Sequence, residues 1–211
     1  MTTKRRMGSE NSATRTTLMD AVEAVMREHG YAAISARSVA GRAGLKYQIV
    51  FYYFETMDDL LLATYRRRTQ AVLTRAERAL ESDQPLHALW TAHVDPSDAA
   101  LSLEYMAMSN HNQVIRTETI AFGEQVRHLL ADRLSPSLRQ AGPDPSVFTP
   151  LGITLALTAL ASILGFESAL GLSGGHREAE GIARWFLQQL EPAGAATAAA
   201  RPRLKTAAGH E

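Results

Sequence analysis

The chain has 211 residues, of which 45% are apolar, with 22 Lys and Arg, 22 Asp and Glu, and no cysteine. This length suits one or two domains with a substantial buried core, and the apolar fraction excludes a wholly disordered chain. The absence of cysteine excludes a disulfide framework, a zinc–thiolate site and a cysteine nucleophile.

The net charge of zero hides an uneven distribution of charge along the chain. Residues 1–68 contain 11 Lys and Arg against 7 Asp and Glu, a local charge of +4, whereas residues 69–211 contain 11 against 15, a local charge of −4. This asymmetry is typical of a chain in which one segment meets a polyanion and the rest does not.

The two ends of the chain differ in composition from the residues between them. Residues 1–12 are polar, contain Lys4, Arg5 and Arg6, and lack the apolar run of a signal peptide, so we expect a disordered basic arm. Residues 192–211 are rich in Ala, Pro and Gly and predict a disordered tail.

Between these ends, almost every periodic segment predicts a helix. Apolar residues recur at spacings of three and four, Gly30 and Gly44 stand at expected stops, and Ser35 and Thr56 stand at expected N-caps. The expected helices cover a segment ending before residue 30, a short segment after residue 35, and residues 46–53, 57–81, 86–94, 98–110, 116–139, 147–172 and 177–190. The predicted fold class is all-α, with an N-terminal three-helix helix-turn-helix domain joined to a larger C-terminal helical bundle.

One segment is apolar enough to consider a membrane span. Residues 145–166 contain no charge, and residues 151–164 are strongly apolar. However, the run contains Pro150 and several Thr and Ser residues, Glu167 follows directly, and neither flank has a Lys/Arg cluster. We therefore favour a helix buried in a soluble, cytoplasmic protein without a membrane partner, and keep a membrane-anchored helical protein as the alternative.

Residues 35–54 predict a helix-turn-helix, because a short capped helix, a turn centred on Gly44 and a second short helix follow one another. The second helix would expose side chains that can hydrogen-bond base edges or phosphates in a major groove. These side chains are Lys46, Tyr47, Gln48, Tyr52 and Tyr53. For the last two, packing between helices is the alternative interpretation.

The same residues carry a resemblance to a known family. The elements are His29-Gly30-Tyr31, Val39-Ala40, Ala43-Gly44-Leu45, Phe51-Tyr52-Tyr53-Phe54 and Leu60-Leu61. Together they resemble the N-terminal domain of TetR-family transcriptional regulators over about residues 14–68. The resemblance implies a DNA-binding domain over residues 13–57 and an effector-binding and dimerisation domain over residues 58–191.

The resemblance also implies roles for single residues. Arg37 and Tyr47 match base-contacting positions, and Ser35, Tyr52 and Tyr53 match phosphate-contacting positions. Lys46 and Gln48 depart from the family pattern by adding a cation and a base reader. Three other departures, Ile49, Phe51 and Met57, each lose a phosphate donor, which predicts weaker binding with a shallower salt dependence.

For the bundle, the resemblance implies a pocket for a small molecule. Apolar, aromatic and methionine side chains with a few polar groups suit a mostly hydrophobic ligand. The candidate ligand-binding residues are Trp90, His93, Tyr105, Met106, Met108, Phe122, Val126, Leu157 and Phe166. For any one of them, ordinary core packing is the alternative.

A homodimer is expected from the apolar helix as well as from the resemblance, since one neighbour cannot cover a helix that is apolar all round. A two-fold dimer would match a palindromic operator in double-stranded DNA. The candidate interface residues are Leu155, Ala159, Ser162, Ile163, Ile182, Trp185 and Phe186.

No sequence motif supports an enzyme. The chain lacks a P-loop, a dinucleotide-binding glycine pattern, an HExxH motif and a nucleophile elbow. Glu124, His128 and Asp132 could share a helix face, but a solvated face is the simpler interpretation than a metal site. We therefore expect no catalytic residues, metal or cofactor. The expected function is repression relieved by a small hydrophobic ligand; the alternative is a regulator of the same fold controlled by a protein partner or without an effector.

Overall fold

The computed structural model describes residues 12–94, 99–141 and 144–192, so the expected basic arm and C-terminal tail lie almost entirely outside the described residues. Over these ranges the chain forms α-helices and one 3-10 turn, and no strand, which confirms the all-α prediction. The helices are α1 (Ala13–His29), α2 (Ala36–Arg42), α3 (Gln48–Tyr53), α4 (Met57–Leu80), α5 (Pro85–Val94), α6 (Ala99–Ser109), α7 (Gln113–Ala141), α8 (Pro150–Leu170) and α9 (His176–Leu190), with the turn η1 (Tyr31–Ala33) after α1.

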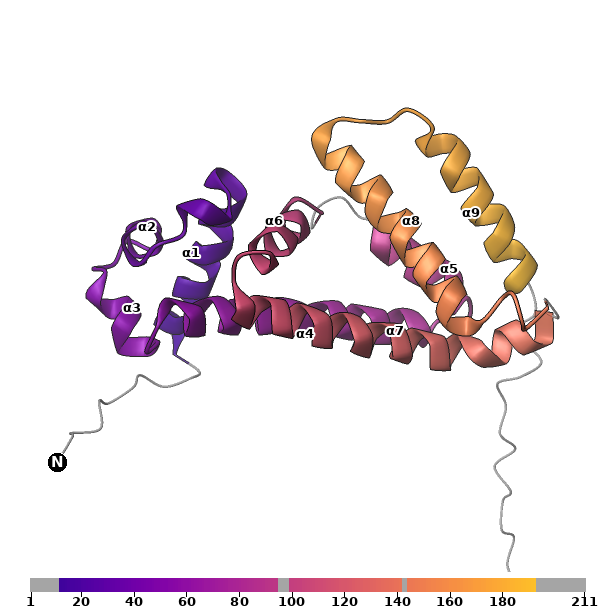
Figure 1. Cartoon of the computed structure of the whole chain (residues 1–211), viewed down its shortest axis with the longest axis horizontal. Coiled ribbons are helices and arrows are strands. Elements are labelled where there is room, and N and C mark those ends of the chain that lie inside the picture. The colour runs from indigo at the N-terminus through magenta and orange to yellow at the C-terminus, as the bar shows by residue number, and fades with distance from the viewer. Residues whose placement is uncertain (1–11, 95–98, 142–143, 193–211) are drawn as a thin grey trace, which may run out of the picture.

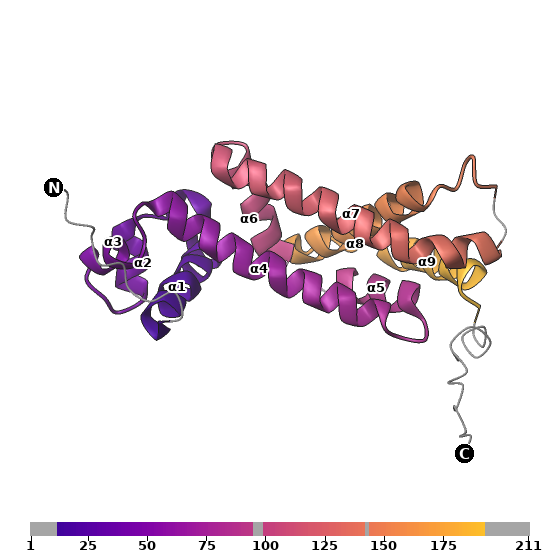
Figure 2. The same cartoon turned by 90° about the horizontal axis from the view of Figure 1, so that it is seen from below.

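The molecule is elongated, with a small head at one end and a bundle at the other (Figure 1). Helices α1, α2 and α3 form the head, and α4 runs from the head along the length of the bundle. Helix α7 lies beside α4, and α8 and α9 lie at the far end (Figure 2). Because α4 packs against both α1 and α7, it belongs to the head and the bundle at once.

Local capping chemistry fixes several helix ends. The predicted capping box at α4 is present, since Asp59 N donates to Thr56 Oγ1 at 3.1 Å and Thr56 N donates to Asp59 Oδ2 at 2.9 Å. Ser35 forms the same arrangement with Ser38 at the start of α2. Helix α1 ends before Gly30, whose φ of +79° lies in the region that favours glycine.

Three helix starts differ from the sequence prediction by two or three residues, each for a local reason. Helix α3 begins at Gln48 rather than at residue 46, because Lys46 and Tyr47 form the preceding turn. Helix α7 begins at Gln113 rather than at residue 116, because the Asn112 side chain accepts a hydrogen bond from Ile115 N at 3.0 Å. Helix α8 begins at Pro150 rather than at residue 147, because Thr149 caps it through Gly152 N at 3.1 Å.

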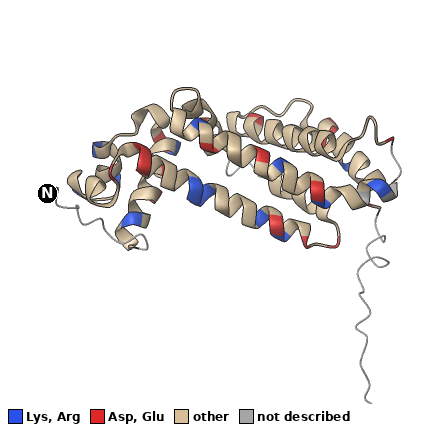
Figure 3. Ribbon diagram, turned by 60° about the horizontal axis from the view of Figure 1, so that its bottom comes forward, with Lys and Arg blue, Asp and Glu red and all other residues tan. Residues whose placement is uncertain are grey.

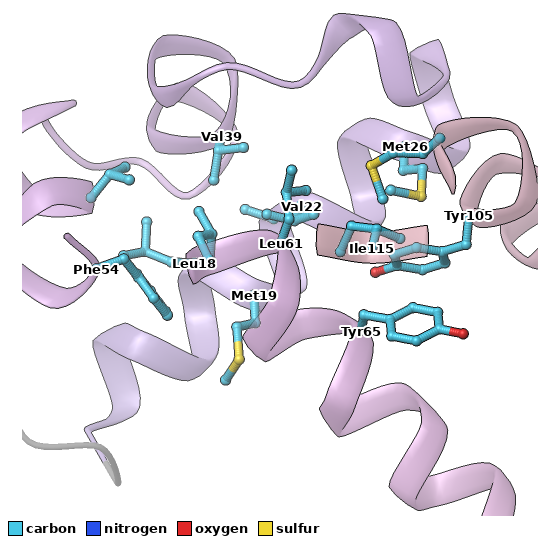
Figure 4. Close-up of a cluster of buried hydrophobic side chains, with 14 of the residues drawn as sticks. Leu18, Met19, Val22, Met26, Val39, Phe54, Leu61, Tyr65, Tyr105 and Ile115 are labelled. Atoms are coloured by element: carbon cyan, nitrogen blue, oxygen red, sulfur yellow. The ribbon is translucent and has the colours of Figure 1, made fainter. Parts of the chain in front are cut away.

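Two apolar cores hold the structure together. The first core contains buried residues of the head, such as Leu18, Val22 and Phe54, together with Tyr105 and Ile115 from α6 and α7 (Figure 4). The second core lies at the far end of the bundle, where α4, α5, α7, α8 and α9 meet. The head is therefore not packed independently, since residues of the bundle complete its core.

Helix α8 is the only helix in the described ranges that is long and apolar enough to cross a membrane, which is weak evidence for a span. It is buried on one side only: 28% of its most apolar 18-residue stretch is buried inside the molecule. Ile153, Ala161 and Leu164 face the bundle, whereas Leu155 and Ile163 are about half exposed. The expectation of a helix buried on every side is therefore not met by the described residues of a single chain, because none of them covers the second face.

Candidate DNA-reading head and bundle cavity

The turn between α2 and α3 has the geometry of a helix-turn-helix. Leu45 N donates to Ala40 O at 2.8 Å and closes the end of α2, while Gly44 adopts a φ of +68°. A residue with a Cβ is strained at that φ, so glycine is needed to make the turn. Val39, Ala40 and Val50 are then buried between α2, α3 and the rest of the head.

One side of α3 is buried in the head, and this burial determines which side chains the other side exposes to solvent. Val50 and Phe54 are buried, so Lys46, Tyr47, Gln48 and Tyr52 lie exposed around the start and outer face of the helix. Ser35 and Arg37, at the start of α2, are exposed as well. Six of the seven candidate DNA-contacting residues are therefore accessible, and their roles remain predictions.

The seventh candidate, Tyr53, is half-buried and is held by α1. Ser12 Oγ donates to the Tyr53 hydroxyl at 3.2 Å, and hydrogen bonds from Ser12 and then Thr14 lower the pKa of this phenol. Arg15 Nη1 donates to the Tyr53 carbonyl oxygen at 3.1 Å, and its guanidinium lies 4.1 Å from the centroid of the Phe54 ring. Arg15 therefore fixes the end of α3 onto α1, a role that sequence reasoning missed.

The three residues that replace phosphate donors differ in their surroundings. Ile49 and Met57 are partly buried and pack against the head core, and Phe51 is partly buried too. Apolar side chains at these positions add packing inside the head. None of the three can donate a hydrogen bond to a phosphate.

The arginines at the head end of α4 form ion pairs within the chain. Arg66 pairs with Glu118 of α7, and the hydrogen bond from this guanidinium lowers the pKa of the Glu118 carboxyl. Arg67 pairs with Asp20 at 2.6 Å and with Glu23 at 3.3 Å, both on α1. Figure 3 shows positions with Lys or Arg interspersed with positions with Asp or Glu along the body of the molecule. The contacts join α4 to its neighbours.

A polar joint connects the head to helices α6 and α7. Glu104 Oε2 accepts a hydrogen bond of 2.7 Å from Tyr31 N, and the Tyr31 ring stacks on His111 with centroids 6.1 Å apart. Asn112 Nδ2 donates to Asp58 Oδ1 at 2.7 Å, which adds a contact to the start of α4. Sequence reasoning missed this joint because its partners lie far apart in the chain.

A cavity of about 480 Å³ lies in the bundle between α4, α5, α6, α7 and α8. Six of the candidate ligand-binding residues line it: His93, Tyr105, Met106, Phe122, Val126 and Phe166. Its wall on α4 also carries Tyr65, Arg68 and Arg75, which the sequence analysis did not select.

Three candidates do not line this cavity. Trp90 and Leu157 line a separate void of about 20 Å³ that is large enough for one water molecule, and His93 lies on the wall of both spaces. Met108 is buried in the head core, because residues two apart on a helix face in different directions and its neighbour Met106 already faces the cavity. For Met108 the structure therefore favours the core interpretation.

The polar groups of the cavity wall include two guanidinium groups, which only donate hydrogen bonds, together with hydroxyl groups and the imidazole of His93. Arg68 Nη2 donates to Ser102 Oγ at 2.8 Å and joins α4 to α6. His93 Nδ1 lies 2.9 Å from the Leu89 carbonyl oxygen, which can only accept, so Nδ1 carries the proton. Burial raises the pKa of Tyr65 and of Tyr105, so both phenols stay neutral at physiological pH. The Tyr105 hydroxyl is buried and has no hydrogen-bond partner among the residues described.

The candidate interface residues form an exposed apolar face on α8 and α9. Leu155, Ala159, Ile163, Ile182 and Trp185 are exposed, and Trp185 and Ile182 are 61% and 68% accessible. Ser162 and Phe186 are partly buried: Ser162 lines the cavity, and Phe186 packs against the second core. In the part of the chain that is described, no three His, Asp or Glu side chains are grouped as metal ligands; Glu124 and His128 form an exposed pair 3.8 Å apart.

Comparison with known proteins defines the class to which this arrangement belongs. Residues 18–64 match the family model described as bacterial regulatory proteins, tetR family. A helix-turn-helix head on a helical body is the plan of a DNA-binding transcriptional regulator. The head matches the N-terminal DNA-binding domain of TetR-family transcriptional regulators, which confirms the resemblance seen in the sequence.

Solved structures of low sequence identity share the whole fold. A regulator from Pseudomonas aeruginosa PAO1 has a TM-score of 0.70 at 23% identity, over 86% of this chain and 91% of its own. The fatty acid degradation regulator FadR from Bacillus halodurans has a TM-score of 0.65 at 16% identity, over 88% and 98%. A regulator from Saccharomonospora viridis in complex with choline has a TM-score of 0.70 at 18% identity, over 82% and 95%. A search of curated proteins gives no significant match.

Proposed function

We propose that the protein is a homodimeric, cytoplasmic repressor that holds a palindromic operator through the two heads of the dimer. The observation that carries the proposal is that the second helix of the helix-turn-helix has one buried side and one accessible side. Val50 and Phe54 anchor α3 in the head core, while Tyr47 and Gln48 are accessible on its outer side. A short helix held rigidly with polar residues outward is what major-groove reading requires.

The exposed side chains divide into base readers and phosphate contacts. The Gln48 amide can both donate and accept, which matches the N6 and N7 edge of adenine, and the Tyr47 hydroxyl can reach a base or a phosphate. Lys46 supplies a cation for the backbone, and Ser35, Arg37, Tyr52 and Tyr53 supply further donors around it. With Ile49, Phe51 and Met57 unable to donate, binding depends on two heads acting together.

Dimerisation is supported by the exposed face of α8 and α9. A monomer that exposes Leu155, Ile163, Ile182 and Trp185 on one side presents the kind of apolar patch that marks a protein interface. Such an interface related by a two-fold axis would give the heads a fixed spacing. Half-sites of a palindrome one turn of DNA apart, or a multiple of it, match that geometry.

Control by a small molecule is supported by the cavity and by its position. The regulator from Saccharomonospora viridis is in complex with choline, so a protein of this fold can bind a small molecule. In this chain Tyr65 and Tyr105 belong both to the cavity wall and to the head core. A ligand that favours one arrangement of these residues would shift the population between a DNA-binding and a released state.

Selection of binding sites from random double-stranded DNA with the purified full chain tests the proposal. The expected result is a palindrome, bound at nanomolar to micromolar concentration and lost when one half-site is scrambled. Tyr47→Ala and Gln48→Ala should each reduce the preference for the selected site over random DNA. The exposed Glu81→Ala, at the far end of α4, is the matched control. Selection of no sequence, or unchanged specificity in both α3 variants, would contradict the proposal.

A further inference from the structure

We infer that the bundle cavity takes an anionic, amphipathic small molecule, with its acidic group at the arginines of α4 and its apolar part against the aromatic wall. The inference rests on the proposed function only in treating this cavity as the effector site. It adds the chemical class of the ligand, which neither the family nor the similar structures specify for this chain.

The first observation is the charge on the cavity wall. Arg68, Val72, Arg75 and Ala76 line the cavity from one face of α4, at the i, i+4, i+7 and i+8 spacing of a single helix face. The rise of an α-helix separates the two arginines by about 10 Å along the axis. His93 of α5 adds an imidazole, and the described lining residues include no Asp or Glu.

The second observation is the hydrogen-bonding character of the same wall. Both arginines already have partners, and Arg68 donates to Ser102 at 2.8 Å. A guanidinium has five N–H donors, so it can bind more than one acceptor at a time. The raised pKa of Tyr65 keeps its phenol neutral, so this group brings no negative charge to the wall. A carboxylate or a similar anion is the ligand group that such donors bind most strongly.

The third observation is the apolar part of the wall. Phe122 and Val126 of α7 and Phe166 of α8 line the cavity beyond the α4 arginines. A volume of about 480 Å³ lies within the range of sites for small organic ligands. A molecule that combined an acidic group with an aromatic or aliphatic body would satisfy both parts of the wall. A cationic ligand would face repulsion from the guanidinium groups in a site partly shielded from water.

Three probes with one carbon skeleton separate charge from shape: 4-phenylbutanoate, 4-phenylbutan-1-ol and 4-phenylbutylamine. Their binding to the purified full chain at pH 7, without DNA, is measured by titration calorimetry. We expect the acid to bind at least about tenfold more tightly than the alcohol, because the carboxylate adds the attraction between opposite charges to the hydrogen bond from the guanidinium. The amine should bind most weakly.

Variants locate the binding group. Arg75→Met, which alters an exposed side chain, should weaken binding of the acid about tenfold and binding of the alcohol much less. Arg68→Met should have the same effect, and Arg68→Lys should retain more of the affinity because it keeps the charge. Arg78→Met removes the same charge from the same helix outside the cavity lining and should change neither. Circular dichroism and thermal unfolding verify that each variant is folded.

The inference is overturned if the amine binds as tightly as the acid, if none of the probes binds at millimolar concentration, or if Arg75→Met and Arg68→Met fold and bind the acid normally. Operator binding by the same preparations is measured separately. Intact operator binding with no preference for the acid removes the ligand class and leaves the proposed regulator in place. Selective binding of the acid without any DNA binding supports the ligand class and contradicts the proposed regulator.

Discussion

Glu104 of α6 accepts a hydrogen bond of 2.7 Å from the backbone N–H of Tyr31, and the same carboxylate lies 3.5 Å from where a side chain on Gly30 would begin. The N–H belongs to the turn that follows α1. One carboxylate of the bundle therefore caps the first N–H of the 3-10 turn that follows a head helix. Helix α6 also contributes Ser102, Tyr105 and Met106 to the cavity wall, so a single helix contacts both the ligand space and the head.

Replacement of Glu104 by Ala should loosen this joint. The Tyr31 N–H would lose its partner in a half-buried position, so we expect a loss of about 1–2 kcal/mol in the free energy of unfolding, measured with urea. Glu104→Gln keeps an acceptor and should cost less. The exposed Glu124→Ala is the control for loss of a carboxylate. Equal stability of Glu104→Ala and wild type would show that the joint contributes nothing.

Arg15 and Lys46 should affect DNA binding in different ways. Arg15→Met removes the contacts to Tyr53 and Phe54, so operator affinity should fall because α3 is held less firmly. Lys46→Met removes an exposed cation beside the predicted groove contact. The operator affinity of Lys46→Met should fall, and the slope of log K against log salt should become shallower by about one unit. Binding measured at four salt concentrations distinguishes the two, and a reduced slope for Arg15→Met would assign it a direct phosphate contact.

Tyr105→Phe is expected to leave the protein equally stable or up to about 1 kcal/mol more stable, because the buried hydroxyl makes no hydrogen bond with any described residue. Tyr65 is the matched control, since Thr119 hydrogen-bonds its hydroxyl and Tyr65→Phe should therefore be destabilising. Thermal unfolding of both variants is the measurement. A clear loss of stability in Tyr105→Phe would mean that the hydroxyl has a partner, such as a bound water.

Ala159→Arg should weaken the dimer. Ala159 lies on the exposed face of α8, where a long charged side chain would meet its counterpart across a two-fold axis. We expect at least a tenfold rise in the dimer dissociation constant, measured by analytical ultracentrifugation, with the helical content unchanged. Gln188→Arg, at an exposed position on α9, tests whether the effect is local. A variant that remains fully dimeric at nanomolar concentration would move the interface elsewhere.

The sequence was informative wherever structure depends on neighbouring residues. The capping box of Thr56 and Asp59, the turn at Gly44 and the apolar spacing of the helices are local, and each prediction about them agrees with the fold. The DNA-binding head could be identified because its pattern lies within one short segment. The roles of its single residues remain predictions, since no DNA contact tests them.

The cavity was predictable only in part, because its wall depends on how distant helices pack. Apolar residues on the bundle helices were natural candidates, and six of them do line it. Arg68 and Arg75 were not selected because charged residues on a helix usually face water; Arg75 is indeed exposed, yet both arginines line the cavity between α4 and the helices α5, α6, α7 and α8. The bond between Glu104 and Tyr31 joins residues 73 positions apart and leaves no mark in either local sequence.

Tyr65 and Tyr105 belong both to the cavity wall and to the head core, and their ring centroids lie 5.0 Å apart. Selection for a new effector and selection for operator affinity therefore act on the same two side chains and constrain each other. Phe122 and Phe166 line the cavity and lie outside the head core. Engineering of a biosensor from this chain would begin at Phe166, because the Phe122 ring packs against Tyr65 of the head core with centroids 6.5 Å apart.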